Sequence, residues 1–230
     1  MKIIAIIPAR YASTRFPAKP LALLGGKRII EWVYRAATEF FDDVIVATDD
    51  SRIAGAGEEF GGRAIMKSSN HRCGTERCAE ALSKIDGEYD IVVNIQGDEP
   101  FTTVEQMRKL VSLFENQDID IATLATPIVG ESAMAEILNP NIVKVVMSPN
   151  STALYFSRSA IPYIRDIEQD RWATHHTFYR HIGMYAFRSD VLKRIVTLEP
   201  TPLERAENLE QLRWMESGYT SGVAPKNEVG

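Results

Sequence analysis

Apolar residues along this chain fall into short strand-like runs that alternate with segments of helical spacing. Residues 2–7 form a β-branched run with almost no polar alternation, which is typical of a central parallel strand covered on both faces. Residues 28–40 place apolar side chains at helical spacing, and residues 43–48 have the pattern of a second strand. The same alternation predicts a helix over 51–59, a strand over 63–66, a helix over 75–84 and a strand over 91–95. Strands interleaved with helices predict an α/β fold with a doubly wound, mostly parallel sheet.

The pattern becomes looser after Pro100. Helices are predicted over 104–114, 133–138, 190–196 and 204–216, and strands over 121–126, 143–147, 153–156 and 181–187. Residues 163–179 carry His175 and His176, have little apolar periodicity, and are expected to form a flap or a subunit contact. Because the chain has no repeat, low-complexity tract or linker rich in Gly and Ser, we expect residues 1–230 to form one domain.

The composition is that of an ordinary globular chain. Its 230 residues are 45% apolar and 25% charged, and 26 basic against 31 acidic side chains give a net charge of −5. Such a chain has no overall attraction to nucleic acid or anionic lipid, so a local cluster of cations must hold any anion it binds. The apolar run at residues 3–9 is far shorter than the ~20 residues of a bilayer span, and Arg10 follows it. We therefore expect no membrane insertion and no signal peptide.

The two cysteines, Cys73 and Cys78, fit neither a disulfide framework nor a C-x-x-C redox pair. A reducing compartment suits this usage, and we expect a cytoplasmic protein. His71 with the two cysteines is a conceivable zinc set, but no second ligand pair at finger-like spacing accompanies it. We therefore interpret the cysteines as a loop thiol and a helix thiol.

The loop after the first strand gathers positive charge. Residues 8–20 contain Arg10, Arg15 and Lys19 together with three prolines and hydroxyls such as that of Ser13. Ligands of open α/β sheets bind beyond the carboxyl ends of the strands. Fixed cations at such a place in an acidic chain favour a polyphosphate site over a solvated basic loop, and prolines reduce the entropy lost on ordering it.

The glycine pattern of this loop excludes two common nucleotide-binding classes. Neither the G-x-G-x-x-G of dinucleotide-binding dehydrogenases nor the G-x-x-x-x-G-K-[ST] of P-loop enzymes follows the first strand. Gly25 and Gly26 lie further along and predict a turn before the first helix.

Two further candidate segments follow predicted strands. Asp98, within residues 96–100, is a candidate ligand for a hard cation that bridges phosphates, and Gly97 allows close approach of the backbone. A structural role for this aspartate is the alternative, and Glu99 is interpreted as a cap or brace of the next helix. Residues 71–77 open a helix, whose first N–H groups favour an anion or the edge of a base.

Taken together, these segments resemble the 3-deoxy-manno-octulosonate cytidylyltransferases, the CMP-Kdo synthetases. The matching stretches run in the family's order over nearly the whole chain: residues 7–21, 46–49, 74–77, 94–100, 153–158, 180–183 and 209–213. Single motifs of this kind recur in other nucleotidyltransferases, but the set with the Phe-Ser-Arg and Arg-His-Ile-Gly segments is specific. The resemblance implies a nucleotidyltransferase-type sheet with a smaller mixed-sheet lobe, and a homodimer.

The activity that this resemblance implies is the Mg²⁺-dependent transfer of CMP from CTP to Kdo, an eight-carbon acidic sugar. The anomeric hydroxyl of Kdo receives the CMP, pyrophosphate is released, and the activated sugar enters lipopolysaccharide biosynthesis. Catalysis of an in-line attack on the α-phosphorus is mainly positioning and neutralisation of negative charge.

The resemblance also implies the roles of individual residues. Its catalytic set is Arg10, Arg15, Lys19 and Asp98, in which Asp98 is the Mg²⁺ ligand. Its nucleotide-binding set is Pro8, Ala9, Arg10, Ser13, Lys19, Gly74, Arg77 and Gln96, with Ala9, Gly74 and Arg77 on the cytosine and ribose side. Its sugar-binding set is Gln96, Arg158, His181, Tyr185, Glu210 and Gln211. An arginine such as Arg158 can pair bidentately with a carboxylate, and the others offer a polar wall for hydroxyls.

The sequence departs from the family at its end. Residues 226–230 stand where family members continue into a further segment, whose first Asp is the expected second Mg²⁺ ligand. We expect weaker metal binding with the rest of the site retained, because Mg²⁺ can keep several waters.

Two other functions stay open. One is a related CMP- or NDP-sugar synthetase that acts on another acidic or amino-modified sugar, and the other is a catalytically impaired CTP-binding homologue. A glycosyltransferase is disfavoured because Asp98-Glu99-Pro100 stands where a D-x-D metal site is expected.

Overall fold

The β-branched run at the start of the chain forms strand β1 (Ile3–Ala9), in which every residue after Ile3 is buried. Strand β1 pairs in parallel with β4 (Asp43–Thr48) on one side and with β6 (Ile91–Asn94) on the other. Side chains of a strand point alternately to its two faces, so burial at successive positions means that both faces are covered. The predicted central parallel strand is confirmed.

The structure is a computed structural model that describes residues 1–11, 17–68, 71 and 73–225. The chain divides into two compact units, which are described separately below. Unit 1 comprises Met1–Arg108 and Met184–Thr197, and unit 2 comprises Lys109–Gly183 and Leu198–Gly230. Strand β10 (Tyr179–Arg188) contributes its first half to unit 2 and its second half to unit 1. The expectation of one domain over residues 1–230 stays a prediction.

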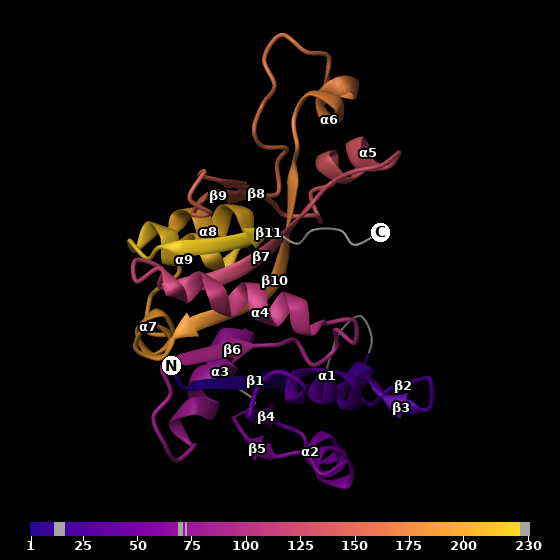
Figure 1. Cartoon of the computed structure of the whole chain (residues 1–230), viewed down its shortest axis with the longest axis vertical. Coiled ribbons are helices and arrows are strands. Elements are labelled where there is room, and N and C mark those ends of the chain that lie inside the picture. Colours follow the sequence, from indigo (N-terminus) through magenta and orange to yellow (C-terminus); the bar gives the residue numbers. More distant parts are fainter. Residues whose placement is uncertain (12–16, 69–70, 72, 226–230) are drawn as a thin grey trace. The chain divides into compact units, whose positions relative to one another are not determined.

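Unit 1 contains a mostly parallel sheet with strand order β10–β6–β1–β4–β5 (Figure 1). Besides β1, β4 and β6, its elements are β2 (Leu23–Leu24), β3 (Lys27–Arg28), α1 (Ile29–Thr38), α2 (Ser51–Glu59), β5 (Ala64–Met66), α3 (Gly74–Ser83) and α7 (Ser189–Ile195). Helix α4 (Val104–Ser112) spans the boundary between the units along the chain. The pairing of β4 with β5 is parallel, and the second half of β10 is antiparallel to β6. The predicted alternation of strands and helices in this region is confirmed.

Helix α1 illustrates how the apolar spacing builds this unit. Its buried residues are Ile30, Val33 and Ala37, which are spaced by three and four positions and therefore share one face. That face packs against β1 and β4.

The glycine pair before α1 closes a hairpin that the apolar pattern did not predict. Strands β2 and β3 pair antiparallel, and the two residues between them are Gly25 (φ +59°) and Gly26 (φ +84°). A two-residue hairpin turn with positive φ at both positions strongly favours glycine. The predicted turn is confirmed, but the two short strands beside it were missed.

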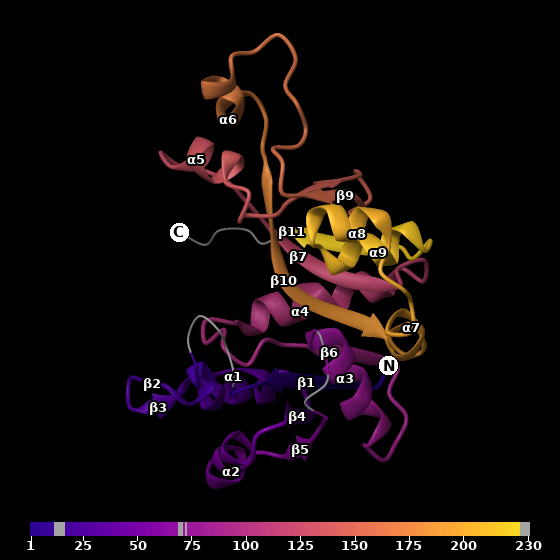
Figure 2. The same ribbon diagram turned by 180° about the vertical axis from the view of Figure 1, so that it is seen from behind.

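Unit 2 combines parallel and antiparallel strand pairs (Figure 2). Its elements are β7 (Ile121–Pro127), α5 (Ala133–Leu138), β8 (Lys144–Met147), β9 (Ala153–Ser157), α6 (Trp172–His175), α8 (Pro202–Glu207), α9 (Glu210–Glu216) and β11 (Ser221–Pro225). Strands β7 and β11 are parallel, whereas β8 is antiparallel to both β9 and β10. A core that includes Phe156, Leu212 and Val223 joins β9, α9 and β11.

The predicted flap contains a small apolar cluster. Within residues 163–179, the buried Trp172 stacks on Phe178 with ring centroids 6.2 Å apart, and both pack with Ile137 of α5. His175 belongs to α6, where Thr174 and the Arg171 carbonyl contact its Nδ1, and the His176 ring meets Phe178 edge-on. The cluster draws its residues from three separate segments, 128–137, 160–167 and 172–178. Each segment contributes only a few apolar residues, so no clear periodicity is visible in the sequence.

In the last part of the chain, one prediction is wrong and one strand was not predicted. The helix predicted over 204–216 is two helices, α8 and α9, because Asn208 between them takes a left-handed conformation with φ +52°. Asparagine tolerates this conformation better than most residues, so it ends α8 without a glycine. Strand β11 was not predicted, because Gly222 and Pro225 within it weaken its strand pattern.

Among the described residues, no helix has the length and apolar content that crossing a membrane would require.

A matched pair of leucines in unit 2 tests the assigned core. Leu124 of β7 is 0% exposed, whereas Leu154 of β9 is 59% exposed. We expect Leu124→Ala to lower the free energy of unfolding by about 2–5 kcal/mol, because it removes buried methyl groups and leaves a cavity. Leu154→Ala should change it by less than about 0.5 kcal/mol. Urea unfolding of both variants measures the difference, and equal losses would contradict the placement of β7 in the core.

Candidate active site

The carboxyl ends of β1 and β6 lie against each other in unit 1. The Ile95 N–H donates to the Ile6 carbonyl at 3.1 Å, and the Gly97 N–H donates to the Pro8 carbonyl at 3.3 Å. A Cβ atom on Gly97 would lie 3.0 Å from Ile30 and 3.1 Å from both Ala9 and the Pro8 carbonyl oxygen. A Cβ here would push its neighbours by a few tenths of an ångström, so glycine suits this close approach, which places the predicted residues Pro8 and Ala9 beside the segment that carries Asp98.

The first residue of helix α3 packs into the same place. A Cβ atom on Gly74 would lie 3.3 Å from Asn94 Nδ2, 3.5 Å from Gln96 Nε2 and 3.7 Å from Pro8 Cγ. The helix packs against β1, β6 and β4. Three residues of the predicted nucleotide set, Pro8, Gly74 and Gln96, are thus neighbours although they are far apart in the sequence.

Lys19 reaches Asp98 across this edge of the sheet. The Lys19 ammonium lies 3.1 Å from Asp98 Oδ2, and both side chains are partly exposed. A short 3-10 turn, Lys19–Leu21, anchors the lysine through the buried Pro20. A partly exposed ion pair of this kind adds little stability. A charged ligand can therefore replace either partner at low cost.

The positive charge of Arg10 lies within electrostatic reach of Arg77. Arg77 is a buried residue of α3, and burial together with the nearby charge of Arg10 lowers the pKa of its guanidinium, with Asp49 opposing the shift. Its Nη2 donates to the His71 carbonyl at 3.4 Å, and its buried Nε has no hydrogen-bond partner among the described residues. Two close guanidinium groups repel each other, and an anion bound between them would relieve that repulsion.

Two predicted residues of the first loop, Ser13 and Arg15, lie outside the described residues. Tyr185, a predicted sugar-side residue, stands opposite Asn94 in the antiparallel pairing of β10 and β6, and its ring stacks near Phe187. Unit 1 therefore brings together most of the described nucleotide set and also holds Gln96 and Tyr185 of the sugar set, whereas the other four sugar-side residues belong to unit 2.

Arg158, at the end of β9, is surrounded by backbone carbonyls of unit 2. Its Nε donates to the Glu207 carbonyl at 2.6 Å, Nη1 to that of Pro140 at 3.0 Å, and Nη2 to that of Asn208 at 3.3 Å. The Glu207 carboxylate in turn accepts from the Arg158 N–H and the Ser157 hydroxyl. These bonds use three of the five N–H groups of the guanidinium, so a sugar carboxylate would need the other two.

His181 of β10 is a half-buried residue with a neutral imidazole. Its Nε2 lies 2.9 Å from the Thr123 hydroxyl, and its ring meets Phe156 edge-on at 5.0 Å. Burial lowers the pKa of His181 to about 3. The side chain can exchange hydrogen bonds with a hydroxyl, but it carries no charge near neutral pH.

Glu210 and Gln211 open helix α9. Glu210 accepts from Nη2 of the buried Arg213 at 3.1 Å, and Gln211 is 5% exposed. Arg213 also pairs with Glu204 at 3.3 Å and donates to the Leu198 carbonyl at 2.8 Å. The structure therefore places Arg158, His181, Glu210 and Gln211 in unit 2, and their roles stay predictions.

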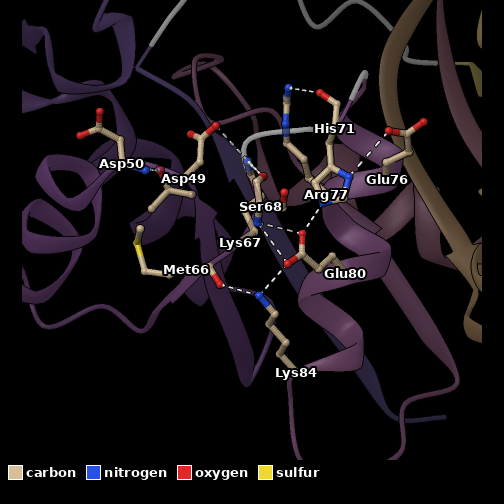
Figure 3. Close-up of polar contacts among 11 residues, drawn as sticks. Asp49, Asp50, Met66, Lys67, Ser68, His71, Glu76, Arg77, Glu80 and Lys84 are labelled. Atoms are coloured by element: carbon tan, nitrogen blue, oxygen red, sulfur yellow. Dashed lines mark hydrogen bonds and ion pairs between the residues drawn. The ribbon is translucent and has the colours of Figure 1, made fainter.

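A polar network beside the nucleotide set was missed (Figure 3). The fully buried ammonium of Lys67 pairs with Asp49 at 3.3 Å, and burial lowers the pKa of this lysine while Asp49 opposes the shift. Both residues follow strands of the parallel sheet, so the rule that sheet ligands lie beyond strand ends could have found them. No sequence signal marked Glu80, which lies in the middle of α3.

The described residues contain no group of three or more His, Cys, Asp and Glu side chains that could hold a metal ion. His71 contacts Glu80 and Glu76, and neither Cys73 nor Cys78 is in a disulfide.

A fold and site of this kind are shared with enzymes that transfer nucleotides. The family model described as cytidylyltransferase matches residues 4–222, so the chain belongs to the cytidylyltransferase family. Within that family, the chain is 53% identical over 232 residues to the 3-deoxy-manno-octulosonate cytidylyltransferase of Phocaeicola vulgatus. The match covers 100% of this chain and 92% of that protein. The enzyme of the same name from Bacteroides thetaiotaomicron is 52% identical over 232 residues, with coverage of 100% and 93%.

A solved structure of CMP:2-keto-3-deoxy-manno-octonic acid synthetase complexed with CTP is also similar. Its TM-score is 0.90 at 39% identity, and the match covers 98% of this chain and 90% of that chain. This likeness confirms the predicted α/β class with a mostly parallel sheet. The resemblance to the CMP-Kdo synthetases is confirmed as well.

The pKa of His181 predicts a pH dependence of stability. An unfolded imidazole binds a proton below about pH 6.5, whereas the folded protein binds it only near pH 3, where burial has moved the pKa. Between these values the unfolded state binds more protons, so the free energy of unfolding falls as the pH falls, by up to about 1.4 kcal/mol per pH unit. His181→Gln should remove this contribution. Urea unfolding across that range measures the slope for both chains, and identical slopes would contradict the buried neutral state.

Proposed function

We propose that this chain transfers CMP from CTP to the anomeric hydroxyl of Kdo and releases pyrophosphate. The observation that carries the proposal is the 53% identity over the full chain to a relative named 3-deoxy-manno-octulosonate cytidylyltransferase. The CTP complex of the similar solved structure supports CTP as the nucleotide. The match extends over the whole chain and therefore includes every segment of the proposed site.

The proposed nucleotide site is the edge where β1, β6 and α3 meet. Arg10 and Lys19 are proposed to hold the triphosphate, with Arg15 assisting, because clustered cations offset the repulsion among phosphate oxygens. Ala9, Gly74 and Arg77 are proposed to contact the base and ribose, and Gln96 to lie between nucleotide and sugar. Pro8 and Ser13 complete the proposed nucleotide set. The close approach of Gly74 to Gln96 and Pro8 supports this grouping.

Mg²⁺ is the proposed cofactor, with Asp98 as its protein ligand. Magnesium prefers oxygen ligands and is commonly held by one or two carboxylates together with waters and substrate phosphates. Asp98 offers one such carboxylate beside Lys19, so the residues present fit this mode of binding. When bound, the ion would supply neutralisation of phosphate charge.

In the proposed reaction, the anomeric oxygen forms a bond to the α-phosphorus while the bond from that phosphorus to the bridging oxygen of pyrophosphate breaks. The hydroxyl proton leaves to solvent, and the charge of the leaving group is met by Lys19 and Arg10. The contribution of the protein is to hold both substrates in line and to supply positive charge where negative charge collects.

The proposed sugar contacts come from Arg158, His181, Tyr185, Glu210 and Gln211, together with Gln96. The two N–H groups of Arg158 that remain beyond its three carbonyl bonds are proposed to meet the carboxylate of the sugar. The neutral His181 is proposed to exchange hydrogen bonds with a sugar hydroxyl.

The wider setting is part of the proposal. We assign the chain to a homodimer in the cytoplasm that supplies lipopolysaccharide biosynthesis. Thiols at Cys73 and Cys78, rather than a disulfide, suit that reducing compartment.

Pyrophosphate release tests the activity directly. With CTP and Mg²⁺, we expect release only when Kdo is present, because water is a poorly positioned substitute for the sugar hydroxyl. A coupled phosphate assay measures it, with UTP and a sialic acid as the matched competitors. Release with another acidic sugar alone would replace the sugar in the proposal, and CTP binding without release would favour a catalytically impaired homologue.

The role of Lys19 predicts a loss of nucleotide affinity. Lys19→Ala should raise the Kd of CTP roughly ten- to hundredfold, because hydrogen bonds to charged groups contribute about 1.5–3 kcal/mol. Lys193→Ala, which removes an exposed ammonium from the last turn of α7, should leave the Kd unchanged. Isothermal titration calorimetry measures both, and equal Kd values for the two variants would contradict the assignment.

A further inference from the structure

One carboxylate, that of Glu80, ties helix α3 to the segment that precedes it (Figure 3). It accepts from the Ser68 N–H at 3.0 and 3.1 Å, pairs with the Lys84 ammonium at 2.6 Å, and contacts His71 Nε2. Hydrogen bonds from Lys84 and then from His71 lower the pKa of Glu80 to about 2, so the carboxylate is charged at neutral pH. The Glu80 carboxylate therefore holds Ser68 and His71, which precede α3, as well as Lys84 at the end of that helix.

His71 links this carboxylate to Arg77. The ring of His71 contacts Glu80 through Nε2, and its Nδ1 lies 3.7 Å from Glu76. The carbonyl of the same residue accepts from Arg77 Nη2 at 3.4 Å. The contacts of the His71 ring with Glu80 and Glu76 therefore restrain the residue whose carbonyl accepts from Arg77.

The start of this segment is anchored independently. The buried Lys67 pairs with Asp49 at 3.3 Å and donates to the Ser68 carbonyl at 3.1 Å, while Lys84 donates to the Met66 carbonyl at 3.0 Å. Lys67 is thus fixed without Glu80, whereas the Ser68 N–H also donates to that carboxylate. His71, further along, depends on Glu80 and Glu76.

Arg77 has a physical need for a fixed acceptor. It is buried, it is repelled by Arg10, and its bond to His71 is long. A bond of 3.4 Å is longer than the usual range of about 2.7–3.2 Å and is therefore weak, so a small movement of its acceptor would break it. Without that hold, repulsion from Arg10 would favour other orientations of Arg77.

We propose that Glu80 is a positioning residue for nucleotide binding, which acts by holding His71 so that its carbonyl orients Arg77 toward the base and ribose of CTP. This inference rests on the proposed function. Because Lys19 and Arg10 lie on the phosphate side of the proposed site, Glu80 affects the cytidine part of the ligand more than the phosphate chain.

The test compares CTP with inorganic tripolyphosphate as ligands of the Glu80→Gln chain. If Arg77 is correctly placed only about a tenth of the time in the variant, the Kd of CTP rises on the order of tenfold. The Kd of tripolyphosphate should stay within about twofold, since it makes no base or ribose contact. Isothermal titration calorimetry gives both constants without requiring turnover.

Glu31→Gln is the matched control. Glu31 lies on helix α1, pairs with Arg35 four residues later at 2.9 Å, and is 15% exposed compared with 19% for Glu80. It contacts neither His71 nor Arg77 in the described structure, so neither Kd should change. His71→Ala provides a second route, because it removes the imidazole that Glu80 holds and should reproduce the selective loss of CTP affinity.

The outcomes separate the two proposals. Absence of CTP binding by the natural chain would overturn the proposed function and this inference with it. With CTP binding intact in the natural chain, equal losses for CTP and tripolyphosphate in Glu80→Gln would overturn the positioning role alone. If Glu80→Gln does not fold, His71→Ala decides: a loss confined to CTP supports the role, and unchanged affinity overturns it.

Discussion

The candidate active site depends first on the parallel register of β1 with β4 and β6. Because the three strands run in one direction, their carboxyl ends meet at one edge, and the segments that leave them are neighbours however far apart they are in sequence. Gly97 and Gly74 then allow backbone to approach where a Cβ would crowd the Pro8 carbonyl or Asn94. Strand pairing thus determines which residues meet, and the two glycines determine how closely.

Charge is arranged at this edge in a way that the net charge of the chain conceals. Arg10, Arg77 and Lys19 gather there, although acidic residues outnumber basic ones overall. Acidic partners divide into two kinds: Asp98 forms a partly exposed pair that a ligand can replace, whereas Asp49 neutralises the buried Lys67. Exposed pairs contribute little stability, but breaking a buried pair leaves an uncompensated charge. Asp98 is therefore free to exchange its partner for a ligand, whereas Asp49 is committed to Lys67.

The periodicity of apolar residues was sufficient to predict strands and helices whose pattern is local. The bounds of β4 and α2 match the predicted ones, and the rule that ligands lie beyond strand ends drew attention to Asp98 and Arg10 from residue order alone. The break at Asn208 was missed because a single left-handed residue leaves the apolar spacing intact on both sides of it. Glu80 was missed for a different reason: its partners Ser68 and His71 come from the segment before α3, and spacing along α3 carries no information about residues outside the helix.

Two cations of unit 2, Lys144 and Arg158, are held by backbone carbonyls, which residue type alone does not reveal. Lys144 is 0% exposed, and its ammonium donates to three carbonyls, one of which belongs to Arg158. Arg158 itself donates to three further carbonyls, and Glu207 accepts from its N–H. Such bonds satisfy donors that burial would otherwise penalise, and they also fix the direction of the guanidinium. An arginine held in this way loses little entropy when a carboxylate binds, so structural anchoring and ligand recognition are compatible in one side chain.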